Sequence, residues 1–141
     1  MTKIIQEYLA PFFLLHNRRI TIGFLGKDVD AVAISSVPET KVIRDYTDGD
    51  RMLKSSYTLS VRFSYGVEGT DRIDSFFLAL HHALLEKNGK GILPELTDGS
   101  FAVSVESDFC AKRERCTANS CIYSVKIHVI HYKTNQKGWM I

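Results

Sequence analysis

The chain has 141 residues, 45% of them hydrophobic and 24% charged, which indicates one folded domain over residues 1–141 and excludes disordered and collagen-like classes. Lys and Arg number 18 against 16 Asp and Glu, so the net charge of +2 provides no general attraction for nucleic acid or an anionic membrane. No apolar run approaches the ~20 residues that a membrane-spanning helix needs.

The N-terminal part predicts a helix followed by short strands. Apolar residues recur at helical spacing from residue 3 to about 15, and Pro11 is expected to kink or end this helix near Ala10. Gln6 and Glu7 precede the apolar run and no small-residue cleavage site follows it, so we interpret it as a cytosolic amphipathic helix and not as a signal peptide. A polar turn follows at Asn17–Arg19. After it we expect three extended segments, Ile20–Gly26, Ala31–Ile34 and Thr40–Tyr46, with Pro38 between the last two.

The segment Ser55–Tyr65 has the clearest strand pattern in the chain. Apolar residues occupy every second position, at Tyr57, Leu59, Val61, Phe63 and Tyr65, and polar residues occupy the positions between them. This alternation indicates a long strand of an antiparallel sheet with one buried and one wet face. Because Asp48, Gly49 and Asp50 predict a turn, we expect a hairpin between Thr40–Tyr46 and Leu53–Tyr65.

The second half predicts one helix and two more strands. Thr70 or Asp71 can cap the helix, and Gly89 can end it. The elements expected after it are a strand in which Phe101, Val103 and Val105 share a face, a polar loop at Ala111–Asn119, a strand in which Tyr123, Val125, Ile127 and Val129 share a face, and a flexible tail at residues 134–141. Since the strands are grouped, we predict an α+β fold, mainly an antiparallel sheet with two helices packed on one face.

The cysteines and histidines near the C-terminus raise the question of a metal site. Cys110, Cys116, Cys121, His128 and His131 lie within a short span, but they lack the closely spaced pairs of typical zinc sites. Cys121 and His131 are roughly 33 Å apart on an extended strand, and His128 points to the opposite face. We therefore predict no metal site and reduced thiols, although a disulfide from Cys110 to Cys116 or Cys121 is sterically feasible.

The pattern of the remaining polar residues favours neither catalysis nor nucleic-acid recognition. His81 and His82 lie in the second helix without a nucleophile motif around them, and the glycines form no phosphate-binding loop. Lys112, Arg113 and Arg115 surround Glu114, which indicates a solvated loop or a contact to an acidic protein. The aromatic residues of Ser55–Tyr65 are expected in the core and not as a surface for base stacking. We predict no enzyme, no cofactor and no specific nucleic-acid binding.

Two stretches resemble tail terminator proteins of long-tailed phages and prophages of Gram-positive bacteria, which are also labelled minor capsid proteins. The first is Val42–Tyr65, with an extended strand ending in Tyr46, the Asp48-Gly49 turn and the long alternating strand. The second is Gly91–Leu96, followed by Asp98-Gly99, a strand, a polar hairpin loop and the long final strand. The resemblance extends from about Ile4 to Tyr132.

The resemblance implies a small α+β protein like the tail terminator of lambda-type phages. Such proteins assemble as a homohexameric ring on the finished tail tube, stop its polymerisation and provide the joint to the head connector. The implied partners are the chain itself, the tail tube protein and the head–tail connector protein. The implied location is the virion, at the head–tail interface, after assembly in the cytoplasm of the bacterial host.

The candidate contact residues lie at the predicted turns, on the wet face and in the tail. They are Asp48, Asp50, Arg51, Arg62, Lys112, Arg113, Arg115 and Trp139. The alternative function is a small α+β module that binds a small ligand or a nucleic acid. A third hypothesis is an enzyme that uses Cys110 or Cys121 as a nucleophile.

Overall fold

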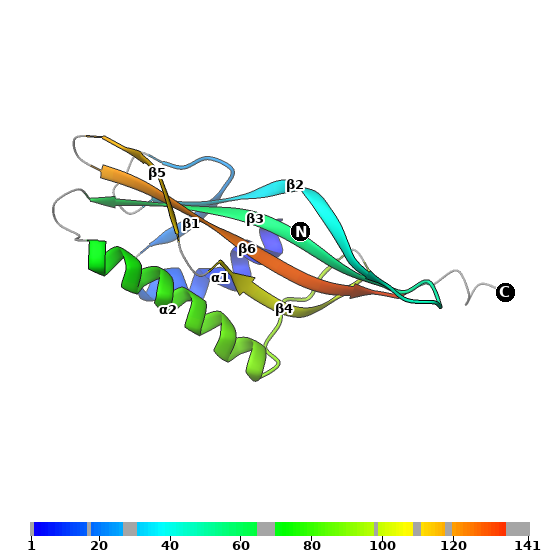
Figure 1. Cartoon of the computed structure of the whole chain (residues 1–141). Coiled ribbons are helices and arrows are strands. Elements are labelled where there is room, and N and C mark those ends of the chain that lie inside the picture. The colour runs from blue at the N-terminus through cyan, green and yellow to red at the C-terminus, as the bar shows by residue number, and fades with distance from the viewer. Residues whose placement is uncertain are drawn as a thin grey trace.

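The computed structural model describes residues 2–16, 18–26, 31–64, 70–97, 99–108, 111–117 and 120–134. Its elements are α1 (Thr2–Leu15), β1 (Arg19–Ile22), β2 (Ala31–Asp45), β3 (Arg51–Ser64), α2 (Thr70–Gly89), β4 (Phe101–Ser107), β5 (Lys112–Cys116) and β6 (Ser120–Lys133). The six strands form one sheet in the order β1-β2-β3-β6-β4, and β5 also pairs with β6 (Figure 1). Only β1 and β2 pair in parallel; the other described pairs are antiparallel, which confirms the α+β prediction.

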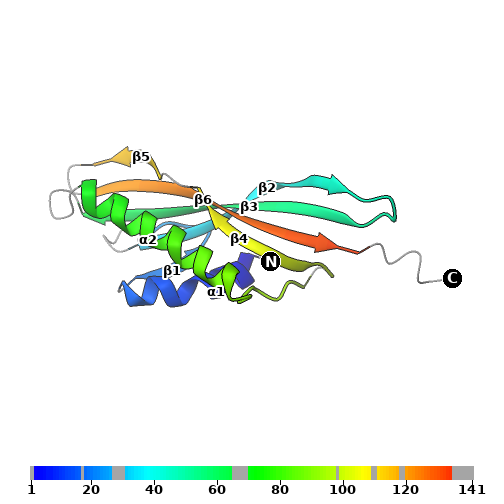
Figure 2. The ribbon, with the colours of Figure 1, turned by 60° about the horizontal axis from the view of Figure 1, so that its bottom comes forward.

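Both helices pack on the same face of the sheet, as predicted (Figure 2). Ile5, Leu9 and Phe13 of α1 and the apolar face of α2 are buried in one core cluster with the sheet. The helices also touch each other, since the ring centroids of Phe12 and Phe76 lie 5.6 Å apart. The opposite face of the sheet has no helix over it among the described residues (Figure 2).

Strand β3 is the central strand of the sheet and pairs with β2 and β6 on its two sides. Tyr57, Leu59, Val61 and Phe63 are each at most 3% exposed, which confirms the face predicted from their alternation. Full burial of such side chains stabilises the fold by about 1.5–3 kcal/mol each. Tyr65 lies outside the described residues.

The hairpin between β2 and β3 is longer than the sequence predicted. The two extended segments expected on either side of Pro38 form the single strand β2, with register shifts between Ser36 and Thr40 and between Val42 and Arg44. A bulge can accommodate a proline, because its backbone has no N–H for the ladder. The distal half of the hairpin projects beyond both helices (Figure 1).

The helix predicted from residue 3 to about 15 is confirmed as α1, but two details of the N-terminal region, an end of the helix near Ala10 and the polar turn at Arg18, were wrong. Helix α1 continues through Pro11, which is exposed, because Ile5 and Leu9 before it and Phe13 after it are all held in the core. Arg18, assigned to a polar turn, is only 5% exposed.

Two predictions about the C-terminal strands were also wrong. Strand β4 contains a bulge between Ala102 and Ser104, which turns Phe101 and Val103 outward while Ala102 and Val105 face the core. The expected polar loop contains strand β5, which pairs with the first residues of β6 and has every residue exposed.

Candidate interaction surfaces

The turn between β2 and β3 carries three of the predicted contact residues. Asp48 Oδ1 accepts a hydrogen bond from the backbone N–H of Asp50 at 3.1 Å, and Gly49 has a positive φ of 90° that favours glycine. Arg51 Nε lies 3.1 Å from Asp45 Oδ1, and both side chains are more than half exposed. The tip is therefore ordered by its own residues, and its charged groups stay accessible to a partner.

A cluster of aromatic rings supports the base of this turn. The Tyr132 ring lies 5.7 Å from that of Tyr46 and 5.3 Å from that of Phe101, measured between centroids. Its hydroxyl donates a hydrogen bond to Asp50 Oδ2. This hydrogen bond raises the pKa of Tyr132 to about 12, because ionisation of the phenol would place a second negative charge beside the carboxylate. Asp50 thus connects the hairpin tip to the end of β6.

Arg62 makes hydrogen bonds within its own chain. Its Nε donates to the Gly26 carbonyl at 3.1 Å, and its Nη1 donates to Ser120 Oγ at 3.0 Å. The side chain lies across the wet face and connects β3 with the start of β6 and with the segment after β1. We assign it a structural role, since its donors face protein acceptors.

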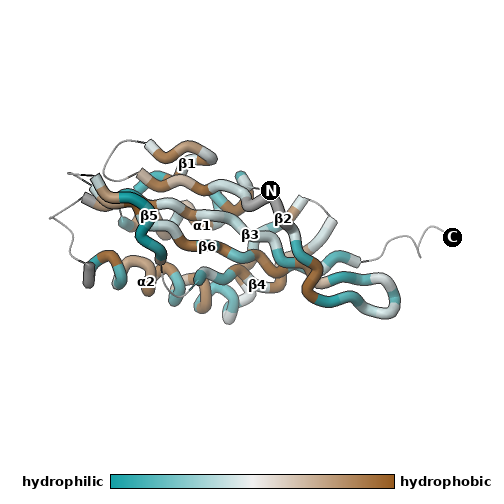
Figure 3. Tube along the Cα trace, turned by 45° about the horizontal axis from the view of Figure 1, so that its top comes forward, coloured by the Kyte–Doolittle hydropathy of each residue, from teal (hydrophilic) through white to brown (hydrophobic). Residues whose placement is uncertain are grey.

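Strand β5 places the predicted basic residues along the sheet edge beyond β4. Lys112, Arg113 and Arg115 are all exposed, and β5 is drawn as hydrophilic along its length (Figure 3). Glu114 lies among them but turns towards β6, where its Oε1 accepts a hydrogen bond from Ser124 Oγ at 2.6 Å. The outward groups of this strand are therefore cationic.

A disulfide closes the β5–β6 hairpin. Cys116 and Cys121 are register partners and are bonded to each other, which corrects the prediction of reduced thiols. Sequence spacing alone did not indicate this pair, because Ala111–Asn119 was predicted to be a loop, whereas Cys116 lies in strand β5 and so has a register partner in β6. Cys110 lies outside the described residues. Within the described ranges, no three His, Cys, Asp or Glu side chains form a group that could hold a metal ion.

Three histidines of β6 and α2, His81, His128 and His131, lie within hydrogen-bond distance of a serine hydroxyl group. His131 is buried between Ser55 and Ser100, whose Oγ atoms lie 2.9 and 2.8 Å from its ring nitrogens. His81 Nδ1 lies 3.3 Å from Ser107 Oγ, whereas His82 is exposed, as expected for adjacent residues of a helix.

A hydrogen-bonded Ser–His–Asp chain on the wet face was missed by sequence reasoning. His128 Nδ1 lies 2.8 Å from Ser56 Oγ, and His128 Nε2 lies 2.9 Å from Asp108 Oδ1. In the Ser-His-Asp triad of serine proteases, Nε2 contacts the serine and Nδ1 contacts the aspartate, which is the reverse of the arrangement here. In α/β-hydrolases the serine lies at a sharp turn, whereas Ser56 lies within a regular strand. We interpret the chain as a connection between β3, β6 and the end of β4. The sheet register brings the residues together, because β3 pairs Ser56 with His128 and the pairing of β4 with β6 places Asp108 beside the same histidine.

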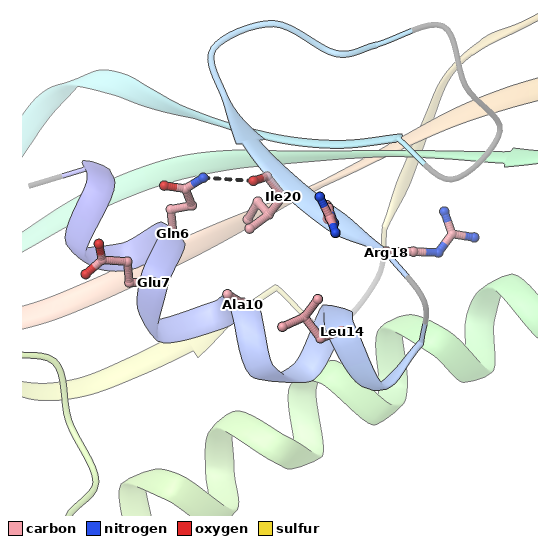
Figure 4. Close-up of a pocket in the computed structure, with 7 residues that line it drawn as sticks. Gln6, Glu7, Ala10, Leu14, Arg18 and Ile20 are labelled. Atoms are coloured by element: carbon pink, nitrogen blue, oxygen red, sulfur yellow. Dashed lines mark hydrogen bonds between the residues drawn. The ribbon is translucent and has the colours of Figure 1, made fainter.

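A groove of about 450 Å³ lies between α1 and β1 (Figure 4). Ala10 and Leu14 of α1 and Ile20 of β1 provide its apolar lining, and its charged lining residues are Glu7, Arg18 and Arg19. Gln6 Nε2 donates to the Ile20 carbonyl at 2.8 Å and so connects the helix to the strand. We call this site the α1–β1 groove.

Apolar side chains are exposed at both edges of the sheet. At the β1 edge, Ile22 is 48% and Phe24 is 76% exposed. At the β4 edge, Phe101 is 57% and Val103 is 42% exposed. Exposed apolar groups gathered on an edge are typical of protein contacts.

The predicted contact residues therefore lie in separate places. Asp48, Asp50 and Arg51 share the hairpin tip, Lys112, Arg113 and Arg115 share β5, Arg62 is bound within the fold, and Trp139 lies outside the described residues. Among the described residues, neither helix combines the length and hydrophobicity that a membrane span requires. Comparison with known proteins found no matching family profile and no matching curated protein.

Proposed function

We propose that this protein is a structural virion protein that forms a ring on the end of a phage tail tube. The ring ends tube polymerisation and provides the joint to the head connector. The resemblance of Val42–Tyr65 and Gly91–Leu96 to tail terminators supports this function, and so does the α+β fold.

The observation that carries the proposal is that the sheet has two open edges with different chemistry. A ring requires a heterologous contact, in which one surface of a subunit meets a different surface of the next. The β1 edge presents Ile22 and Phe24, whereas the opposite edge presents the cations of β5 and the apolar residues Phe101 and Val103 of β4. Two such surfaces on one chain satisfy this requirement.

The projecting β2–β3 hairpin suits a contact along the ring axis. Its tip carries Asp48 and Arg51, exposed charges on an ordered turn away from the helices. The tail tube protein or the head–tail connector would meet this tip. The Cys116–Cys121 disulfide also fits a virion, because disulfides persist at virion surfaces outside the reducing cytosol.

The test combines the purified chain with tail tube protein and follows tube length by electron microscopy. The proposed function predicts rings by light scattering at high concentration, short tubes of fixed length and ring density at one tube end. A chain that stays monomeric at high concentration and leaves tube growth unchanged would show that the proposal is wrong.

A further inference from the structure

We propose that the α1–β1 groove binds the C-terminal segment 135–141 of a second copy of the chain. The inference deepens the proposed function, since it assigns one part of the contact between neighbouring subunits. It rests on the lining of the groove, on the hydrogen bonds of the β1 edge and on the distance between the groove and the end of β6.

The groove is suited to apolar side chains. Leu14 lines it and is 58% exposed, although it lies on the same helix as the buried Leu9 and Phe13. Its volume of about 450 Å³ can take a large aromatic ring together with a smaller apolar side chain. Leu15, the last residue of α1, is 83% exposed, and Phe24, two residues after the end of β1, is 76% exposed.

The hydrogen bonds at β1 favour burial of side chains over addition of a strand. A peptide that extends a sheet needs free carbonyls and N–H groups along its edge. The Ile20 carbonyl already accepts a bond from Gln6 Nε2, and the Ile22 carbonyl accepts one from the Phe24 N–H at 3.0 Å. A ligand of this site would therefore be recognised through the apolar groups that it buries.

The C-terminal segment has side chains of this kind. Trp139, Met140 and Ile141 follow the polar residues Thr134–Lys137 and Gly138. Tryptophan provides a large contact area, and the unbranched methionine adapts to irregular surfaces. If these side chains were buried in the groove, the assembly would no longer expose them to water.

The sheet register excludes the groove of the same chain as the binding site. Ile20 lies in one row across the sheet with Val32, Val61 and Tyr123. Tyr123 precedes Lys133, the last residue of β6, by ten positions, which corresponds to about 33 Å along the strand. From β6 to β1 the row crosses β3 and β2, which adds about 14 Å perpendicular to the strands. Trp139 lies six residues beyond Lys133 and can reach at most about 22 Å from it.

The length of the segment after Lys133 does not prevent it from reaching the groove of a second copy. The tail of one subunit and the groove of the next are different surfaces, so their contact is heterologous and can close into a ring. Figure 1 shows the separation, with the end of β6 at the hairpin end of the sheet and α1 packed under its other half.

Trp139 is the single tryptophan of the chain, so its fluorescence reports on the tail directly. We expect its emission to shift to shorter wavelength as the full chain is concentrated, in parallel with the rise in mass measured by sedimentation velocity. Leu14→Arg should remove the shift and weaken self-association at least tenfold. Leu85→Arg is the matched control, because Leu85 is a 48% exposed helical leucine outside the groove, and it should leave both unchanged.

A Trp139 emission wavelength that does not change with protein concentration would overturn the inference. The tryptophan would then be either buried in its own subunit at all concentrations or exposed to water at all concentrations. Equal effects of Leu14→Arg and Leu85→Arg would also overturn it. Circular dichroism of both variants checks that they are folded. Rings that cap tubes while Trp139 stays solvated would refute the inference and leave the proposed function standing. A shift and self-association without any effect on tubes would refute the function alone.

Discussion

The buried arginine directly before β1 leads to a specific prediction about stability. Arg18 Nη1 donates to the Arg62 carbonyl at 2.8 Å, and its guanidinium carbon lies 4.6 Å from the centroid of the Phe63 ring and 5.4 Å from that of Phe76. A hydrogen bond from a charged donor contributes about 1.5–3 kcal/mol. Each cation–π contact adds about 0.5–1 kcal/mol, and the cost of desolvating the cation offsets part of the total. We expect Arg18→Ala to lower the free energy of unfolding by about 3 kcal/mol.

Urea and thermal unfolding followed by circular dichroism measure this change. For a domain of this size, about 3 kcal/mol corresponds to a fall in Tm of about 12 °C. Arg18→Lys should recover only part of the loss, because an ammonium group cannot stack and donate as the planar guanidinium does. Arg19 is the matched control, since it is the adjacent residue and is exposed.

Arg19→Ala should change the free energy of unfolding by no more than about 0.5 kcal/mol. If the substitutions at Arg18 and Arg19 have the same small effect, the assigned contacts of Arg18 contribute nothing, and the reasoning from burial and geometry is wrong.

Three further predictions test the β4 bulge, the hairpin tip and the basic edge. Val105→Ala should lower the free energy of unfolding by about 2–3 kcal/mol, because Val105 is 0% exposed, whereas Val103→Ala should cost less than about 0.5 kcal/mol in the same urea titration; equal losses would contradict the bulge. The Asp50 contact stabilises the fold below the ordinary Tyr132 pKa of 10.0, and this contribution should be lost as pH rises through about 12; in an absorbance titration Tyr132→Phe should remove one late-ionising phenol, and loss of a phenol that ionises near 10 instead would contradict the contact. Charge reversal on β5 should abolish ring formation in sedimentation velocity, while reversal of Lys90, an exposed residue directly after α2, does not, and rings that persist would exclude β5 from the subunit contact; the three residues to reverse together are Lys112, Arg113 and Arg115.

The local pattern of apolar residues was sufficient to predict an element where one of its faces is buried along its whole length. The alternation in β3 predicted its buried residues, and the helical spacing of apolar residues from residue 3 to about 15 predicted α1. The β2–β3 hairpin followed from the turn at Asp48-Gly49. These features depend on neighbours in sequence, so the sequence is enough to identify them.

Long-range pairing decided the features that local pattern missed. Strand β5 is polar on every side and has no alternation to reveal it; it exists because β6 offers a free edge to its backbone. The bulge in β4 adds one residue to the strand, so Phe101 and Val103 face the opposite side of the sheet from the side that strict alternation with Val105 predicts. The alternation of apolar residues in the sequence does not reveal such an extra residue.

The candidate surfaces divide in the same way. The charges at Asp48–Arg51 and on Lys112, Arg113 and Arg115 were evident from sequence, because turn residues and clustered cations are typical of exposed surface. Sequence alone determined the composition, the alternation of β3 and the apolar C-terminal segment. Only the tertiary structure decided that Arg62 is bound internally, that Arg18 is buried, and that the α1–β1 groove lies out of reach of the tail of its own chain. The physical reason is that hydrogen-bond partners and distances across a sheet depend on strand register, which pairs residues far apart in the chain.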